Sequence, residues 1–344
     1  MRRLRPLITT LLILTSSFVI AKPTVNVYAW GNEIPTQLIW QFEQESGINV
    51  NFSTYDSNET MYTKLRASKE PIYDVIVPSG YFVERMATQH LLTTLDVTKL
   101  PNLANLDPLF KANHYDPGSA HSVPMVWGVT GIFYNSHWIS NPPTSWQMLW
   151  DPRWKNQLMM LDDAREIFSI ALITLGYNAN DTNPDHIQEA YQKLLLLVPN
   201  IKLFGSDAIQ SVMIDEDSTL GSSWNGDVVK AHAENPRVEF IYPKEGFIIW
   251  VDCLAIPSNA PHPNEAYQFI NFMLKAQSGA EITLQQGYPT TNLPGKKRLP
   301  DTMQNDPLIF PSVDVLKHGE FQRDVGEKTI DLYNEYWQKL KLAF

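Results

Sequence analysis

Strand patterns and helix patterns alternate along this chain from about residue 24. Residues 24–30, 48–55 and 73–79 are apolar and β-branched runs that are typical of strands. A helix pattern follows each run, at 34–47, 57–68 and 81–90, and Gly47 marks the end of the first helix. This order of elements predicts a mostly parallel sheet with helices packed on both of its faces.

A second series of the same kind follows the first without a long linker between them. It runs through residues 127–135, 155–163, 164–176, 222–234 and 238–243. One long helix is expected after it, over residues 264–286. A length of 344 residues suits about two domains. The sequence therefore predicts an α/β protein of two lobes in close contact.

Residues 1–21 have the three parts of a secretory signal peptide: a basic start, an apolar middle and a cleavage site that ends in Ala21. Cleavage there removes three arginines, which leaves 24 basic and 37 acidic side chains and changes the formal charge from −10 to −13. This charge argues against nucleic acid as a partner, because a nucleic-acid-binding protein needs a basic face. We therefore expect an exported protein, and its negative charge favours cationic ligands.

Motifs for a cofactor, a metal or a disulfide are not evident in the sequence. There is no H-E-x-x-H, no G-x-S-x-G and no Cys/His set with metal-binding spacing. The one cysteine, Cys253, has no internal partner for a disulfide and does not follow the cleavage site, where a lipoprotein would need it. We expect no cofactor and no metal, and we expect Cys253 to be a small buried apolar residue.

Aromatic and acidic residues recur where the expected strands end, which is where open α/β sheets bind ligands. Trp250 and Asp252 lie two residues apart on one expected strand, so their side chains point to the same face. Aromatic rings bind methylene groups and attract cations, while carboxylates accept N–H bonds. The combination therefore suits an alkylammonium ligand.

Several segments together resemble the spermidine/putrescine-binding proteins of bacterial polyamine ABC importers, from about residue 24 to the C-terminus. They are STYDSNETMYTKL, YDVIVPSGYFVERM, LDDAREIF, WNGD, YPKEG, WVDCLAIP, GYPTTN and GEFQRDVG. The resemblance implies a two-lobed α/β periplasmic binding protein of type II, in which crossing hinge strands join the lobes. It also implies a monomer, without enzymatic activity, that closes on a polyamine in the periplasm and delivers it to a membrane permease.

The resemblance also implies lobe boundaries and ligand residues. Lobe 1 would comprise residues 22–131 and 251–298, and lobe 2 would comprise 132–250 and 299–344. The positions that match the family's aromatic wall are Trp30, Tyr81, Trp224, Trp250 and Tyr288. Those that match its carboxylates are Asp163, Glu166 and Asp252, and those that match its supporting polar groups are Ser79 and Gln322.

Glu33 marks a departure from the family pattern. After the first strand the family usually shows Trp, a hydroxyl residue, an acid and Tyr, whereas this chain has Trp30-Gly31-Asn32-Glu33. We include Glu33 as an anchor for a third ammonium group, which slightly favours spermidine over putrescine.

Structural roles also explain these residues taken one at a time. The tryptophans suit core packing, Ser79 and Gln322 suit loop hydrogen bonds, and Glu33 suits a solvated acid. Asp163 and Glu166 have the spacing of a helix capping box, although Asp162 is an alternative cap that would free Asp163.

Two other functions remain open from the sequence. One is a secreted hydrolase that uses paired carboxylates such as Asp163 and Asp252. The other is a binding protein of the same architecture for an anion or ferric iron, although the basic or tyrosine clusters that such ligands need are not evident.

Overall fold

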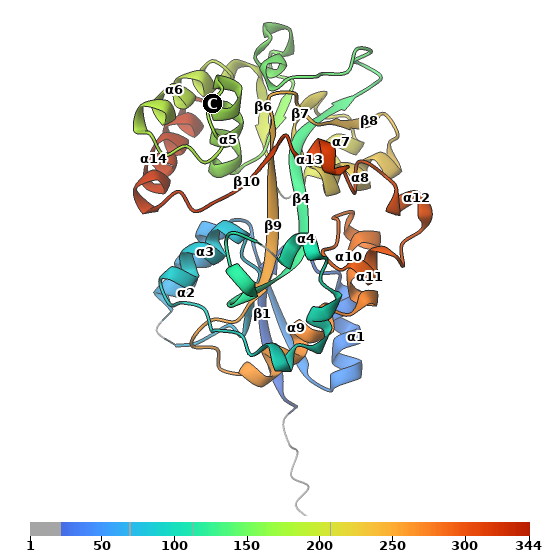
Figure 1. Ribbon diagram of the computed structural model, residues 1–344. Coiled ribbons are helices and arrows are strands. Elements are labelled where there is room, and N and C mark those ends of the chain that lie inside the picture. The colour runs from blue at the N-terminus through green and yellow to red at the C-terminus, as the bar shows by residue number, and fades with distance from the viewer. Residues whose placement is uncertain (1–21, 69, 112, 207) are drawn as a thin grey trace, which may run out of the picture.

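The computed structural model describes residues 22–68, 70–111, 113–206 and 208–344, which form a two-lobed α/β protein (Figure 1). The expected signal peptide, residues 1–21, lies outside the described residues. Two long strands run through both lobes, and helices surround the sheet in each lobe (Figure 1). The two-lobed α/β architecture expected from the sequence is confirmed.

The first lobe is built on three parallel strands, in the order β2-β1-β3. Its N-terminal elements are β1 (Thr24–Trp30), α1 (Thr36–Ser46), β2 (Asn49–Tyr55), α2 (Asn58–Ala67), β3 (Val75–Ile76) and α3 (Gly80–Thr88). Helix α1 ends at Gly47, which adopts a left-handed φ of 72°. Helix α2 begins at Ser57, whose side chain accepts a hydrogen bond from the backbone N–H of Thr60. The alternation predicted for this part of the chain is therefore confirmed.

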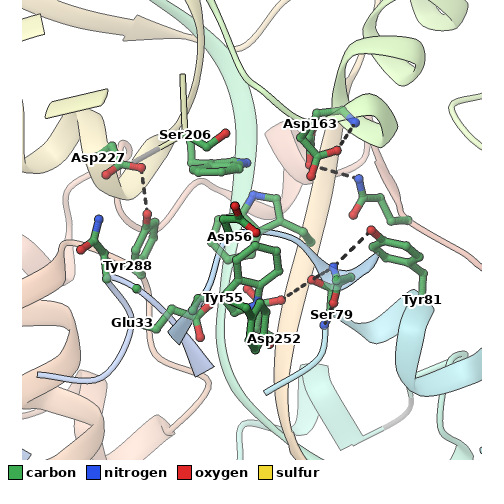
Figure 2. A pocket seen from close by; sticks show the side chains of 18 residues that line it. Glu33, Tyr55, Asp56, Ser79, Tyr81, Asp163, Ser206, Asp227, Asp252 and Tyr288 are labelled. Carbon is green, nitrogen blue, oxygen red and sulfur yellow. Dashed lines mark hydrogen bonds between the residues drawn. The ribbon is translucent and has the colours of Figure 1, made fainter. Parts of the chain in front are cut away.

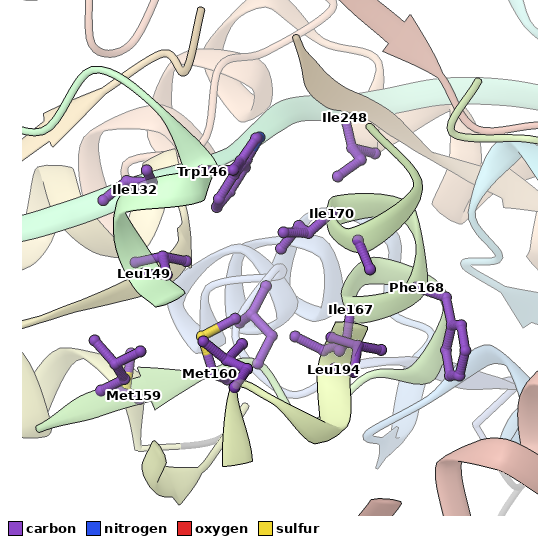
Figure 3. Packing of buried hydrophobic residues seen from close by; sticks show 14 of the residues in the cluster. Ile132, Trp146, Leu149, Met159, Met160, Ile167, Phe168, Ile170, Leu194 and Ile248 are labelled. Carbon is purple, nitrogen blue, oxygen red and sulfur yellow. The ribbon is translucent and has the colours of Figure 1, made fainter. Parts of the chain in front are cut away.

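The second lobe repeats this plan with β5 parallel to both β6 and β7. Its elements are β5 (Leu158–Met160), α5 (Ala164–Leu175), α6 (Pro184–Leu195), β6 (Ile201–Phe204), α7 (Ile209–Ile214), β7 (Leu220–Trp224), α8 (Asn225–Glu234), β8 (Val238–Ile241) and α14 (Glu327–Ala343). In its core, Trp146, Met160, Ile167, Ile170 and Leu194 are almost fully buried together (Figure 3). Burying this much apolar surface is the main contribution to the stability of the lobe.

The C-terminal helix α14 packs on α5 and α6 through aromatic side chains. The rings of Phe168 and Tyr333 lie 5.0 Å apart, and those of Tyr191 and Tyr336 stack at 4.6 Å. The last residues of the chain are therefore attached to the second lobe (Figure 1).

Two antiparallel strands, β4 (Ser122–Asn135) and β9 (Phe247–Ala255), join the lobes into one ten-stranded sheet. Every residue of both strands is buried, which explains why apolar residues occupy both faces of each strand rather than every second position. Strand β4 begins five residues before the expected start, because Ser122–Val126 also pairs with β9. Pro124 is tolerated there because the register shifts between it and Val126. Strand β10 (Gly319–Phe321) pairs in parallel with β9.

The prediction of one helix over 264–286 is wrong, because the chain forms α9 (Pro263–Met273) and α10 (Ala276–Gln286) instead. Lys275 is extended, with φ −63° and ψ 145°. The carbonyl oxygen of Leu274 accepts hydrogen bonds from the side-chain amides of Asn105 and Asn292, at 3.0 and 2.8 Å. These tertiary contacts satisfy the carbonyl outside the helix and separate the two segments.

The remaining helices are short connections. They are α4 (Pro108–Lys111), α11 (Leu293–Lys296), α12 (Asp301–Gln304), α13 (Val313–Leu316) and 3-10 turns at 97–99, 101–105, 117–119, 146–150, 152–154 and 198–200. No helix in the described part of the chain is both long and apolar enough to span a membrane. Cys253 is fully buried with a free thiol, as the sequence predicts.

Candidate ligand-binding site

A cavity of about 80 Å³ lies between the lobes, at the ends of strands from both of them (Figure 2). All of the residues selected from the sequence line it. They are Trp30, Glu33, Ser79, Tyr81, Asp163, Glu166, Trp224, Trp250, Asp252, Tyr288 and Gln322. The structure therefore brings together residues that are as far as 292 positions apart in the chain.

Seven further residues line the cavity and were not selected from the sequence. They are Gly31, Asn32, Tyr55, Asp56, Asn58, Ser206 and Asp227. The rule that ligands bind at strand ends would have found Tyr55 and Asp56, since β2 ends at Tyr55. Asp227 lies in the WNGD segment, from which only Trp224 was selected as a ligand residue.

The first carboxyl group at the base of the cavity belongs to Asp252, on β9. The Ser79 hydroxyl donates a hydrogen bond of 2.5 Å to Oδ1 of Asp252. Asn58 orients this hydroxyl, because its Nδ2 donates to Ser79 Oγ at 3.0 Å and its Oδ1 accepts from the Ser79 backbone N–H at 3.0 Å. Ser79 thus has a defined role beyond a loop hydrogen bond.

Glu33 lies beside Asp252 and is only 5% exposed, so the interpretation as a solvated acid is wrong. Burial raises the pKa of Glu33 well above its usual value, and the charge of Asp252 raises it further. Burial also raises the pKa of Asp252. Among the described residues Oε2 of Glu33 has no hydrogen-bond partner, so nothing there stabilises a charge on this buried acid.

A second pair of acids, Asp163 and Glu166, lies at the start of α5. Oδ1 of Asp163 accepts the backbone N–H of Glu166 at 2.9 Å, so Asp163 is itself the helix cap. The alternative that Asp162 is the cap is wrong, since Asp162 instead forms an ion pair with Lys341 at 2.8 Å. Asp163 both caps the helix and lines the cavity, because its carboxylate has more acceptor sites than the cap occupies.

Glu166 is held by Gln322, whose Nε2 donates to Oε1 of Glu166 at 3.0 Å. Its other oxygen, Oε2, has no partner. Burial raises the pKa of Glu166 to about 8, with the charge of Asp163 as the second cause. Gln322 therefore orients an acid of the cavity.

A single carboxyl group, that of Asp227 on α8, lies away from these two pairs of acids (Figure 2). It accepts hydrogen bonds from the Tyr288 hydroxyl at 2.8 Å and from Nε2 of Gln210 at 2.9 Å. The ring of Tyr288 in turn meets the indole of Trp250 edge-on, at 5.5 Å and 77°. Asp227 thus fixes one aromatic side of the cavity.

The aromatic residues are both core and cavity wall, so these two interpretations do not exclude each other. Trp250 is 7% exposed and packs in a buried cluster with Tyr288. Trp30 is half-buried and lies 4.8 Å from the ring of Tyr55. The Nε1 atoms of Trp30 and Trp250 are buried without a partner, which leaves two donors at the wall.

Six side chains that line the cavity carry a carboxyl group, and none of its described lining residues is Lys, Arg or His. Arg165 is buried nearby, but its guanidinium donates to the Ala179 carbonyl and the Ser169 hydroxyl. Across the described residues, no group of three or more His, Cys, Asp or Glu side chains is arranged to hold a metal ion. The cavity thus combines aromatic faces with an excess of negative charge.

Residues 37–311 match the family of bacterial extracellular solute-binding proteins. This chain belongs to that family. The match includes the joining strands β4 and β9 and most of the residues that line the cavity, whereas Trp30, Glu33 and Gln322 lie just outside it.

Among its relatives, this solute-binding protein is similar to two spermidine/putrescine-binding periplasmic proteins. That of Salmonella typhimurium is 42% identical over 319 residues, which cover 92% of this chain and 91% of the relative. That of Haemophilus influenzae, named protein 1, is 42% identical over 325 residues, with coverages of 94% and 90%.

Solved structures show the same fold for related solute-binding proteins. A putative spermidine/putrescine ABC transporter protein from Listeria monocytogenes superposes with a TM-score of 0.91 at 36% identity, over 93% of this chain and 99% of the other. A spermidine/putrescine ABC transporter substrate-binding protein from Streptococcus pneumoniae gives 0.79 at 34% identity, with the same coverages. Both agree with the two-lobed architecture.

Proposed function

We propose that this solute-binding protein is an extracytoplasmic receptor that captures a polyamine and delivers it to an ABC permease in the membrane. The observation that carries the proposal is the lining of the cavity, where six carboxyl groups and, among the described residues, no basic side chain accompany an aromatic wall. A buried excess of negative charge is stabilised by a ligand of opposite charge. The names of the similar proteins support this ligand class, and a solute-binding family favours a receptor over a hydrolase.

The binding mode follows from the separation of the acids. The methylene chain would lie against Trp30, Trp224 and Trp250, where the ring faces also attract cations. The ammonium groups would bind at three places, namely Glu33 with Asp252, Asp163 with Glu166, and Asp227. Because three separate acidic places match three ammonium groups, we propose spermidine as the preferred ligand and putrescine as a second one.

Closure of the lobes follows from contacts that the ligand makes with both of them. We propose the boundaries 22–131 with 251–298 and 132–250 with 299–344, and bending of β4 and β9 between them. Within this division Asp252 belongs to lobe 1 and Glu166 to lobe 2. A ligand that contacts both acids makes more contacts in the closed state than in the open one, and it therefore stabilises the closed state. The ion pair between Arg85 and Asp324, at 2.6 Å, joins the same two lobes.

The cellular setting is part of the same proposal. Residues 1–21 would direct export, and the mature chain would act in the periplasm as a monomer, without a cofactor. The similar proteins from Salmonella and Haemophilus are named as periplasmic, which supports this location.

Thermal unfolding of the ligand-free protein tests the proposed function. Spermidine or putrescine at about one hundred times its Kd should stabilise the fold by about 2.7 kcal/mol, because the ligand binds only the folded state. We expect the melting temperature to rise with either amine and to stay constant with amino acids or sugars. The protein should first be stripped of ligand by unfolding and refolding. An unchanged melting temperature at millimolar spermidine, putrescine and cadaverine would refute a polyamine receptor.

Gly226 provides a test of the aromatic wall. A Cβ at this position would lie 2.1 Å from Cδ1 of Tyr288, so Gly226→Ala must displace the ring. Such overpacking costs about 1–3 kcal/mol, more than the roughly 1 kcal/mol that Ala contributes to a helix relative to Gly. We expect polyamine affinity to fall by roughly tenfold to a hundredfold, measured by calorimetric titration.

Gly279 is the matched control for this change, because it is also a helix glycine where a Cβ would be overpacked, 2.7 Å from Oγ1 of Thr290, but it does not line the cavity. Gly279→Ala should lose stability and still bind the amine as the wild type does. Equal affinities for Gly226→Ala and wild type would show that Tyr288 does not shape the binding site.

A further inference from the structure

Glu33 and Asp252 form a pair of carboxyl groups that come from different parts of the chain and meet at the base of the cavity (Figure 2). Glu33 follows β1 and Asp252 lies on β9, and each is 5% exposed. Asp252 accepts from Ser79, whereas Oε2 of Glu33 has no partner. Burying an ionised carboxylate without a partner costs free energy. In the empty cavity this cost must be removed in another way.

In the described part of the chain, the titratable groups that face Glu33 are Asp252, Tyr55 and Tyr288, and none of them supplies a positive charge. Burial raises the pKa of both tyrosines well above the usual value, so these hydroxyls stay neutral. Two adjacent carboxylates in a buried site cannot both ionise without a counter-charge. The pKa shifts of the two acids agree with this, since burial raises the pKa of both Glu33 and Asp252, and the charge of Asp252 raises the pKa of Glu33 further.

We propose that the Glu33–Asp252 pair holds one proton in the empty cavity and exchanges it for an ammonium group of the ligand. The proton leaves to solvent, and the ammonium takes its place as the positive charge between the two carboxylates. This inference rests on the proposed polyamine ligand. It makes Glu33, the residue that departs from the family pattern, the group that links affinity to pH.

The direction of the pH dependence follows from the exchange. The pair binds a proton more tightly when the cavity is empty than when the ammonium is present, so acid favours the empty state. Affinity should therefore fall as the pH drops below the raised pKa of the empty pair. For one proton the decrease approaches tenfold per pH unit.

A second pair complicates the proton count and defines the control. Glu166 faces Asp163, Arg165, Thr130 and Gln322, and its pKa is about 8. It can therefore release a proton on binding as well. Glu166→Gln and Glu33→Gln each replace one buried acid of the same cavity by an amide of the same shape, so comparing them separates the two contributions.

The test is calorimetric titration of putrescine into the ligand-free protein in buffers of different ionisation enthalpy. At about pH 6 the amine itself stays protonated, because primary amines have a pKa near 10.4. The dependence of the observed enthalpy on the buffer gives the number of protons released. We expect the wild type to release protons when the amine binds, and Glu33→Gln to release about one proton fewer. Glu166→Gln should still release the proton that comes from the Glu33–Asp252 pair.

Equal proton release by wild type and Glu33→Gln would overturn the inference, as would an affinity that is constant between about pH 5 and 7. If Glu33→Gln binds too weakly to titrate, infrared difference spectra of Glu166→Gln, in which Glu33 is intact, decide the question. Loss of a protonated carboxyl band on binding at about pH 7.5 in Glu166→Gln supports the exchange, and an unchanged band refutes it. Absence of binding at every pH would instead refute the polyamine ligand itself, and the inference with it.

Discussion

Asp252→Asn is expected to weaken polyamine binding by about 2–5 kcal/mol, roughly thirtyfold to a few thousandfold. The change keeps the shape of the side chain and leaves an acceptor for the Ser79 hydroxyl, but it removes the charge that we propose receives an ammonium group. The loss is large because Asp252 is 5% exposed, so water does not replace the missing carboxylate. Calorimetric titration of spermidine into both proteins measures it.

The same substitution should leave the empty protein at least as stable as wild type. Burial raises the pKa of Asp252, which means that its ionised form costs folding free energy above that pKa, and Asn removes this cost. Asp314→Asn is the control, because it removes one acid that is exposed and pairs with Lys317. Normal binding by Asp252→Asn, or an equal loss in Asp314→Asn, would contradict the role assigned to Asp252.

Trp250→Ala should reduce both stability and affinity, because Trp250 is at once a core residue and part of the cavity wall. Truncating a buried tryptophan costs about 3–5 kcal/mol of unfolding free energy. Removing a desolvated ring from beside a cation costs about 2 kcal/mol or more, a loss of at least roughly thirtyfold in affinity. Denaturant unfolding of the empty protein and calorimetric titration measure the two losses separately.

Trp146 is the matched control for this experiment. It is fully buried in the second lobe, donates from Nε1 to the Gly246 carbonyl at 2.8 Å, and does not line the cavity. Trp146→Ala should lose a similar amount of stability and keep its affinity. If Trp146→Ala and Trp250→Ala lost the same affinity, the weaker binding of Trp250→Ala would result only from its lower stability.

Local sequence signals predicted much of the fold, because they act over a few residues. The periodicity of 24–90 predicted three strands and three helices in the right order, and Gly47 and Ser57 marked a helix end and a helix start that the structure confirms. The signals were less informative where distant partners decide the backbone. Asn105 and Asn292 separate α9 from α10, and β9 extends β4 towards its N-terminus.

For the cavity, the sequence by itself determined which kinds of side chain stand at the strand ends, since alternation along β9 places Trp250 and Asp252 on one face. The resemblance to the polyamine-binding family added further candidate residues, such as Glu166 and Gln322. Only the tertiary structure decided which of these groups meet and how deeply they are buried. From the sequence Glu33 suits a solvated acid beside Asn32, and it becomes a partner of Asp252 because the end of β1 lies beside the middle of β9 at the cavity. Its pKa depends on that burial and on that neighbour, and neither exists until the sheet has formed.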